Sequence, residues 1–240
     1  MRDISTLTKN PLESSTIKNP PITEDIVEIP SNNPETPIKL DENPDPVEIS
    51  SYMLTDANFV GYESLEQQEH IYRLASYGVL SSTTKSVIDF GCGRGDFGSY
   101  ILKVINPSIQ YSGIDVNNLM IQIGESKYPN QLNLKVADYF NLDTDSEYEW
   151  VFNNINCTIP YGYHTGDKWE QLLNLIDISI KTCSLGCVFI LLNDKTTFNG
   201  FYQYNPGELI IHLDKKNLRY AVDNTDMHDV FKLVIFKQPF

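Results

Sequence analysis

The stretch that decides the fold lies at residues 86–98 and reads SVIDFGCGRGDFG. Its first five residues, 86–90, form an apolar run that predicts a buried strand. A glycine-rich turn follows at once, and residues 96–105 predict a helix after it. Glycine is needed in such a turn because the backbone must turn tightly and let a ligand approach without a Cβ in the way. The stretch therefore predicts a strand, a ligand-binding turn and a helix in succession.

The same alternation of strands and helices continues along the chain. Further strands are expected at 111–116, 133–137, 148–153 and 186–192, and helices at 64–77, 118–126, 168–182 and 205–215. Two last strands, 218–222 and 230–237, are joined by a polar link and should pair as an antiparallel hairpin. This order predicts an α/β fold: a doubly wound, mostly parallel seven-stranded sheet with a C-terminal antiparallel hairpin and helices on both faces.

The first fifty residues differ in composition from the rest. They contain no aromatic residue, eight of the thirteen prolines, ten acidic residues and four basic ones. Such a segment cannot bury enough apolar surface to offset the entropy of ordering its backbone. We therefore expect residues 1–51 to be a disordered acidic tail and residues 52–240 to be the folded domain. The tail is either a solubilising segment or a docking segment for a protein partner.

Charge and cysteine usage restrict the function further. The net charge of −14 and the isoelectric point near 4.6 disfavour nucleic acid as a partner, since phosphates are bound mainly by basic surfaces. The four cysteines show no zinc-ligand spacing, so no metal site is expected. The N-terminus has no apolar run, and no stretch approaches the ~20 apolar residues of a membrane span. These features indicate a soluble protein of the reducing cytoplasm.

Two ligand-binding motifs fit the glycine-rich turn. Residues 93–98 satisfy G-x-G-x-x-G, the dinucleotide fingerprint, and residues 89–95 satisfy D-x-G-x-G-x-G. The second pattern resembles motif I of class I (Rossmann-like) S-adenosylmethionine-dependent methyltransferases. The terminal hairpin favours this resemblance, which spans roughly residues 59–237. A dehydrogenase would also need a catalytic set such as Tyr-x-x-x-Lys, and the chain has none.

The resemblance implies S-adenosyl-L-methionine as the cofactor and places its contacts. The Asp115 carboxylate would take both ribose hydroxyls, Asp138 would meet the adenine amino group, and Arg94 would meet the methionine carboxylate. The segment around Tyr62 would cover the methionine end. The implied cofactor residues are Tyr62, Gln68, Asp89, Gly91, Cys92, Gly93, Arg94, Gly95, Asp115, Val116, Met120, Asp138, Tyr139 and Asn153.

Four of these residues have an alternative structural role. Asp89 could only cap the turn, Cys92 could be a small buried filler, Arg94 could be a solvated loop charge, and Met120 could belong to the core of its helix.

The residues that would contact the methyl acceptor are expected in the stretch after the strand at 148–153. Its catalytic candidates are Asn154, Tyr161 and His164, and His164 has the side chain whose ordinary pKa suits a general base. The double proline of adenine amino-methyltransferases and the Pro-Cys pair of cytosine-5 enzymes are both missing here. The expected function is therefore methyl transfer to a small molecule or a protein. The alternatives are a non-catalytic cofactor-binding adaptor that docks through its tail, and a nucleic-acid methyltransferase recruited by a partner.

Overall fold

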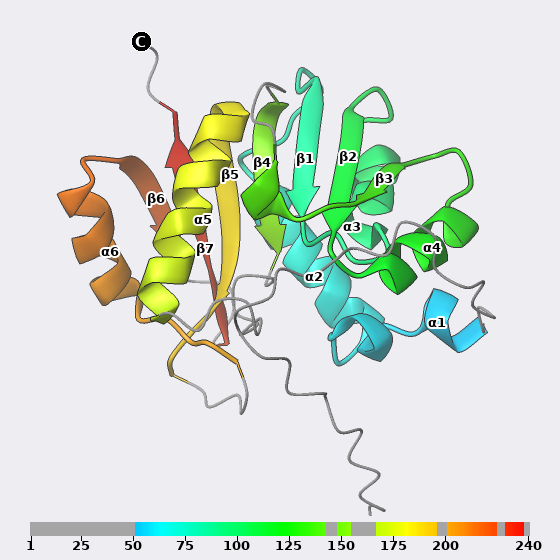
Figure 1. The fold of residues 1–240 in the computed structure, drawn as a ribbon, viewed down its shortest axis with the longest axis horizontal. Helices are drawn as coiled ribbons and strands as arrows, with labels where there is room; N and C mark the ends of the chain where they lie inside the picture. Colours follow the sequence, from blue (N-terminus) through cyan, green and yellow to red (C-terminus); the bar gives the residue numbers. More distant parts are fainter. Residues whose placement is uncertain (1–50, 143–147, 155–166, 196–200, 225–228, 238–240) are drawn as a thin grey trace, which may run out of the picture. The chain divides into compact units, whose positions relative to one another are not determined.

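The computed structural model describes residues 51–142, 148–154, 167–195, 201–224 and 229–237 (Figure 1). The predicted tail lies outside the described residues except for its last position, Ser51, which begins a short helix, α1 (Ser51–Thr55). The disorder of the tail and the domain boundary at residue 52 therefore stay predictions.

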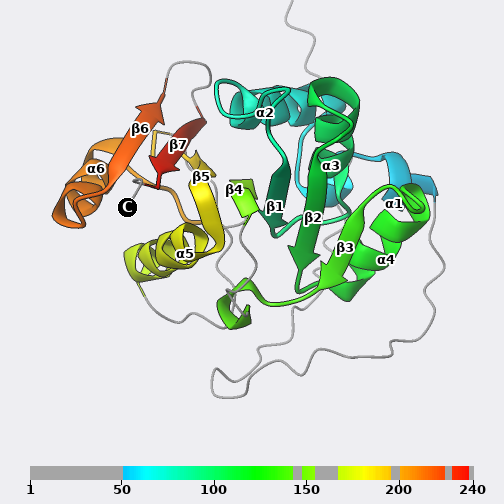
Figure 2. The same cartoon turned by 90° about the horizontal axis from the view of Figure 1, so that it is seen from above.

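Seven strands form one sheet in the order β3-β2-β1-β4-β5-β7-β6 (Figures 1 and 2). Their bounds are β1 Ser86–Phe90, β2 Gln110–Asp115, β3 Asn133–Val136, β4 Tyr148–Asn154, β5 Cys183–Leu192, β6 Arg219–Asp223 and β7 Val230–Phe236. The first five strands pair in parallel, and β7 runs antiparallel to both of its neighbours, β5 and β6. The predicted fold class, with its terminal antiparallel hairpin, is confirmed.

Helices cover both faces of the sheet. The bounds of the helices after α1 are η1 Asn58–Val60, α2 Leu65–Ser76, α3 Asp96–Tyr100, η2 Ile101–Ile105, α4 Asn118–Lys127, η3 Tyr139–Asn141, α5 Lys168–Thr182 and α6 Pro206–Lys215. Figure 2 shows α2 and α3 against one face and α5 against the other. Each face has its own buried cluster: one joins α2 and α3 to the sheet through residues such as Ile71 and Phe97, the other joins α5 and α6 through Leu172 and Leu213.

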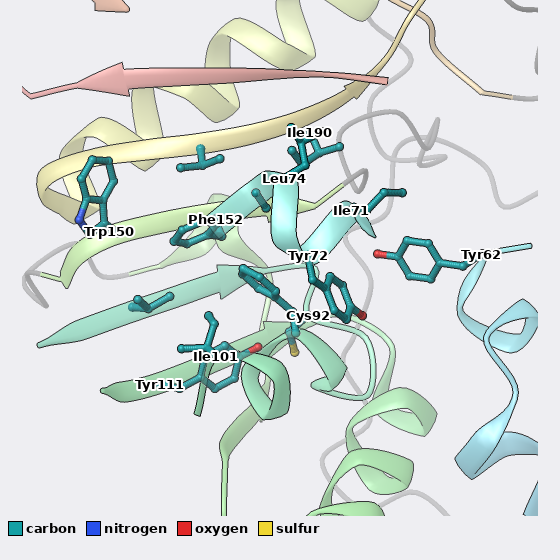
Figure 3. Packing of buried hydrophobic residues seen from close by; sticks show 14 of the residues in the cluster. Tyr62, Ile71, Tyr72, Leu74, Cys92, Ile101, Tyr111, Trp150, Phe152 and Ile190 are labelled. Atoms are coloured by element: carbon teal, nitrogen blue, oxygen red, sulfur yellow. The ribbon is translucent and has the colours of Figure 1, made fainter. Parts of the chain in front are cut away.

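The start of α2 follows the local sequence closely. The Ser64 hydroxyl accepts a hydrogen bond from the Gln67 amide at 3.1 Å, and the Gln67 side chain reaches back to the Glu63 amide at 2.8 Å. The first bond satisfies an amide that a helix start leaves without a partner, and the second fixes the residue that precedes the N-cap. The helix then buries Ile71, Tyr72 and further apolar residues against the sheet, as Figure 3 shows.

Two helices differ in detail from the sequence-based expectation. The helix expected at 96–105 is divided, because its second half, η2, is a π-helix. Gly98 lies in the first half at a point where a Cβ would collide with the ring of Tyr111 on β2, so this helix packs unusually close to the sheet. In α5, the helical spacing of the sequence predicts an apolar side made of Trp169, Leu172, Leu173, Ile176 and Ile180. The structure buries Leu172 and Ile176 of these, together with Leu175, and leaves the other three half-buried.

Within the described ranges, no helix is both long enough and apolar enough to cross a bilayer. The same part of the chain contains no group of three or more His, Cys, Asp or Glu side chains arranged to hold a metal ion.

Candidate functional site

A cavity of about 310 Å³ lies at the carboxyl ends of β1, β2 and β4. In parallel sheets this edge collects the loops that follow the strands, and ligands bind there at the point where the strand order reverses. In this sheet the order reverses between β1 and β4. Nine residues selected from the sequence line the cavity: Tyr62, Asp89, Gly91, Cys92, Gly93, Arg94, Asp115, Met120 and Asn154.

The glycine-rich turn forms one wall of this cavity. Gly91, Gly93 and Gly95 have φ angles of 68°, 54° and 79°, in the left-handed region that favours glycine. A Cβ at Gly93 would meet nothing within 4 Å, so it would project into open space. At Gly95, by contrast, a Cβ would lie 2.8 Å from Leu132, and this glycine does not line the cavity. Gly93 therefore keeps space open, while Gly95 permits close packing.

Asp115 ends β2 beside the turn, and its carboxylate is held by backbone amides. One oxygen accepts from Gly93 N and the other from Asn117 N, each at 2.8 Å. Burial raises the pKa of Asp115, and the hydrogen bonds from Asn117 and Gly93 oppose that rise. A carboxylate has about four lone-pair sites, so about two remain for a ligand donor such as a pair of hydroxyls.

Asp89 is the carboxyl group buried deepest in the cavity wall, with 2% of its surface exposed. Its Oδ2 accepts a hydrogen bond from the Tyr111 hydroxyl at 2.9 Å, while its Oδ1 is buried without a partner. Burial raises the pKa of Asp89 to about 8, although the Tyr111 hydrogen bond opposes the rise. Asp89 thus does more than cap the turn, because it presents a carboxyl oxygen with unused hydrogen-bonding capacity.

Arg94 is 1% exposed, so the alternative of a solvated loop charge is wrong. Its Nε donates to Asp96 Oδ2 at 2.6 Å and its Nη1 donates to the Met53 carbonyl of α1. Its Nη2 is buried without a partner, and the residue lines the cavity. The guanidinium is therefore fixed on two sides and keeps one donor group for a ligand.

Asp96 holds this arrangement in place from the first turn of α3. Besides Arg94, its carboxylate accepts from Lys127 Nζ at 2.7 Å and from the Tyr128 hydroxyl at 2.5 Å, both at the end of α4. Burial pushes the pKa of Asp96 upward, but the hydrogen bonds from Lys127, Tyr128 and Arg94 together hold it below its ordinary value. Asp96 is therefore an ionised anchor for Arg94.

Tyrosine and amide side chains line the rest of the cavity. Tyr62 packs edge-on against Tyr72 of α2, with ring centroids 5.8 Å apart, and the two lie side by side in Figure 3. Burial raises the pKa of both phenols, so they stay neutral. At the end of β4, the amide nitrogen and oxygen of Asn154 are buried, and neither has a hydrogen-bond partner within the described part of the chain. Phe201, which is 46% exposed, also lines the cavity.

Cys92 and Met120 could each have had a purely structural role, and the structure differs between the two residues. Cys92 is buried in the apolar cluster under the turn, as a small filler would be, and it also lines the cavity. Met120 is only half-buried on α4 and lines the cavity, so assigning it to the core of its helix is wrong.

Three expected cofactor residues near the turn do not line the cavity. Gln68 is 4% exposed and donates to the Tyr72 hydroxyl at 2.9 Å and to Asp96 at 3.3 Å, so it supports lining residues from behind. Val116 follows Asp115 and is half-buried outside the cavity wall. Gly95 is the third such residue, because it packs against Leu132 and not toward the cavity.

Three expected residues after β3 and on β4 also lie away from the cavity wall. Asp138 caps η3, and its oxygens accept from Phe140 N at 2.9 Å and Asn141 Nδ2 at 3.0 Å. Tyr139 is buried and stacks on Phe90, with ring centroids 5.5 Å apart. Asn153 is wholly buried and donates to Ser179 of α5 at 3.2 Å. Asp138 therefore acts as a helix cap, and Tyr139 and Asn153 belong to the buried interior.

The other two catalytic candidates, Tyr161 and His164, lie outside the described residues, so their roles stay predictions. Several lining residues were not selected from the sequence: Val60, Gly61, Tyr72, Asp96, Phe97, Asn117 and Phe201. Tyr72 lies in the helix expected at 64–77, and Asn117 lies two residues after the strand-end Asp115, so each is close in sequence to an expected feature. Phe201 is brought in only by the tertiary fold.

The chain is similar in sequence to known methyltransferases. The model of the ubiE/COQ5 methyltransferase family matches residues 64–183. The "Putative methyltransferase 235L" of Invertebrate iridescent virus 6 is 36% identical over 128 residues, which are 53% of this chain and 46% of that protein. The chain thus matches less than half the length of this curated relative.

Solved structures share the fold at low sequence identity. The N-methyltransferase NodS of Bradyrhizobium japonicum WM9, in complex with S-adenosyl-L-homocysteine, is 16% identical, with a TM-score of 0.53 over 72% of this chain and 87% of its own. The geranyl diphosphate C-methyltransferase of Streptomyces coelicolor A3(2), also with S-adenosyl-L-homocysteine, is 8% identical, with a TM-score of 0.53 over 72% and 78%. Methyltransferases for different acceptor atoms thus share this architecture.

Proposed function

The chain belongs to the ubiE/COQ5 methyltransferase family, and on this premise we propose that it is an active methyltransferase that binds S-adenosyl-L-methionine in the cavity at the carboxyl ends of β1, β2 and β4. The observation that carries the proposal is that four buried polar atoms with no hydrogen-bond partner among the described residues lie on residues of this one cavity: Asp89 Oδ1, Arg94 Nη2 and both amide atoms of Asn154. Buried polar groups are normally hydrogen-bonded, so such atoms mark a place where a ligand supplies the partners.

The residues present fit the parts of this cofactor. The Asp115 carboxylate retains acceptor sites for the two ribose hydroxyls, and Met120 offers an apolar side chain for the adenine. A carboxylate at Asp89 and the guanidinium of Arg94 would complement the ammonium and carboxylate of an amino-acid end. The open space above Gly93 leaves room for the ligand backbone.

The cofactor supplies a methyl group already activated by its sulfonium, so the protein's task is to hold donor and acceptor in line. Asn154 is the described residue placed to orient the acceptor, because its free amide lies at the end of β4 on the cavity wall. Tyr161 and His164 follow in the same connection and remain candidates for that task.

We propose a small molecule or a protein as the acceptor. The net charge of −14 disfavours nucleic acid, since an acidic surface repels phosphates. The architecture itself does not favour one acceptor atom, because the neighbours include an N-methyltransferase and a C-methyltransferase. The acidic N-terminal segment is proposed as a docking element for a protein partner.

Thermal-shift titration tests the proposed cofactor. S-adenosyl-L-homocysteine should raise the melting temperature, because a ligand that binds only the folded state stabilises it by mass action. NAD should leave the melting temperature unchanged. Stabilisation by NAD and not by S-adenosyl-L-homocysteine would overturn the assignment of the cavity to a methyl donor.

A second experiment separates an enzyme from a cofactor-binding adaptor. The protein is incubated with S-adenosyl-L-methionine carrying a deuterated methyl group, together with an extract of its source, and products are analysed by mass spectrometry. An enzyme should produce an acceptor heavier by one labelled methyl group, and the control lacking protein should not. Cofactor binding without any labelled product would support the adaptor.

A further inference from the structure

The cavity contains two buried ionisable groups that each keep one unused polar atom. Asp89 is 2% exposed and Arg94 is 1% exposed, and Asp89 Oδ1 and Arg94 Nη2 have no hydrogen-bond partner among the described residues. Asp89 lies near the end of β1 and Arg94 in the turn that follows, and both line the same cavity. Their pairing with the amino-acid end of the cofactor rests on the proposed function, but the protonation state of Asp89 raises a separate question.

We propose that Asp89 is protonated in the ligand-free cavity and releases its proton when an ammonium group binds beside it, so that the cavity selects ligands with that ammonium and binds them more tightly as the pH rises. The proton passes from the carboxyl group to the solvent. The resulting carboxylate then faces the ammonium, which keeps its own proton and charge.

The surroundings of Asp89 favour the neutral carboxyl group in the ligand-free state. Burial removes the water that would stabilise the carboxylate, and the nearby charge of Asp115 on β2 disfavours a second negative charge, so the pKa of Asp89 is raised to about 8. Among the described residues, the Tyr111 hydroxyl is the one group that donates to this carboxyl group, at 2.9 Å, and it favours the ionised form.

Other titratable groups around Asp89 do not replace it as the source of the proton. Tyr62, Tyr72 and Tyr111 approach from the segment before α2, from α2 and from β2, and burial raises the pKa of each phenol, as it does that of the Cys92 thiol in the turn. These four groups therefore stay neutral. In α3, Asp96 has a lowered pKa and is ionised in the pair with Arg94.

Asp115 requires a control, because burial raises its pKa too. It lies at the end of β2, where the ribose is proposed to bind, and it would respond to any ligand with an adenosine end. A ligand with adenosine but no amino-acid end therefore separates the two carboxyl groups.

The direction of the pH effect follows from linkage. Below the ligand-free pKa near 8, binding must first remove the proton, so the affinity should fall by up to about tenfold for each pH unit below that value. Above it, the carboxylate is already formed, and the affinity should level off. An opposite slope would contradict the proposed proton release.

Isothermal titration calorimetry measures the proton directly. S-adenosyl-L-homocysteine and 5′-methylthioadenosine, which lacks the amino-acid end, are titrated at pH 7 in phosphate and in Tris, buffers with different ionisation enthalpies. The first ligand should release about 0.5–1 proton more than the second. Equal proton release by the two ligands overturns the inference. Failure of S-adenosyl-L-homocysteine to bind even at pH 8.5 would instead overturn the proposed cofactor site.

Two variants assign the proton to a residue. Asp89→Asn cannot ionise and should abolish the difference between the two ligands. Tyr111→Phe keeps the ring but removes the hydroxyl that stabilises the carboxylate, so the pH at which the affinity levels off should move upward. An unchanged pH profile in Tyr111→Phe would overturn the assignment to Asp89 even if Asp89→Asn failed to fold.

Discussion

At the scale of single residues, the proposed site depends on groups whose geometry is fixed before any ligand arrives. Asp115 shows this most simply, since both of its oxygens are oriented by backbone amides of the loops that follow β1 and β2. A carboxylate held in this way does not have to be ordered on binding, and preorganisation of this kind lowers the cost of association.

Replacing Asp115 by Ala should weaken S-adenosyl-L-homocysteine binding by about 2–3 kcal/mol, or roughly 30- to 160-fold, because a charge-assisted pair of contacts to the ribose is lost. Calorimetry measures the change. Asp138→Ala is the matched control, since the oxygens of Asp138 are taken up by the cap of η3 and its residue does not line the cavity. Unchanged affinity in Asp115→Ala would remove Asp115 from the site.

Gly93→Ala should weaken S-adenosyl-L-homocysteine binding tenfold or more, about 1.4 kcal/mol or above, because the new methyl group would occupy space that the ligand needs. The left-handed φ of 54° adds a stability loss of about 1 kcal/mol. Gly78→Ala is the matched control: its φ is 70°, a Cβ there also meets nothing within 4 Å, and the residue lies outside the cavity wall. Equal affinities of the two variants would contradict the role of Gly93.

The candidate site was predictable from the sequence only where a local rule applies. The glycine-rich turn and the strand-end Asp115 follow from motif and spacing, because they are adjacent to the strands that place them. Phe201 and Val60 reach the cavity through the tertiary fold, which no local pattern contains. Asp138 was assigned from family resemblance, whereas the structure uses its carboxylate as a helix cap.

At the scale of elements, the strands were predicted to within about three residues, because most of them contain a short apolar run bounded by polar or glycine residues. The π-helix η2 was not predicted, since local propensity does not distinguish it from an α-helix. A similar limit applies to α5, because helical spacing predicts an apolar side but not which of its residues face the sheet.

The end of α2 depends on a buried lysine from a distant strand. Lys232 of β7 is 5% exposed, and its ammonium donates to the Leu74 and Tyr77 carbonyls, each at 2.8 Å. Burial lowers the pKa of this group, which is partly offset by Asp223. A cation at this position also complements the partial negative charge of a helix C-terminus. The contact therefore fastens α2, and with it the cavity-lining Tyr72, to the far half of the sheet.

Lys232→Met should lower the free energy of unfolding by about 1–3 kcal/mol, because two helix-terminal carbonyls lose a charged donor in a buried place. Urea denaturation followed by circular dichroism measures the loss. Lys135→Met on β3 is the control, since that strand lysine is exposed and its replacement should change the stability by less than about 0.5 kcal/mol. A loss no larger in Lys232→Met than in the control would show that this contact is dispensable.

At the scale of the whole molecule, the described residues contain a complete sheet with buried apolar clusters on both faces. The clusters begin at Ala57 and extend to Ile235, and the last strand, β7, is inserted between β5 and the edge strand β6. Within the described part of the chain, the side chains of Arg94 and Asp115 form hydrogen bonds with Met53, Gly93, Asp96 and Asn117. We therefore expect that the acidic segment before residue 51 is not needed to assemble the core or the cavity.

Deleting residues 1–50 should therefore leave the melting temperature within about 2 °C of that of the full chain, because an aromatic-free acidic segment contributes no core. Affinity for S-adenosyl-L-homocysteine should also be unchanged, since α1 and its Met53 carbonyl, which hold Arg94, are retained. Differential scanning calorimetry and ligand titration of the two proteins measure both quantities. A longer deletion, of residues 1–55, is the matched comparison: it removes the Met53 contact and should weaken binding. A fall of many degrees after the shorter deletion would show that the acidic segment packs on the domain and that the boundary drawn from composition is wrong.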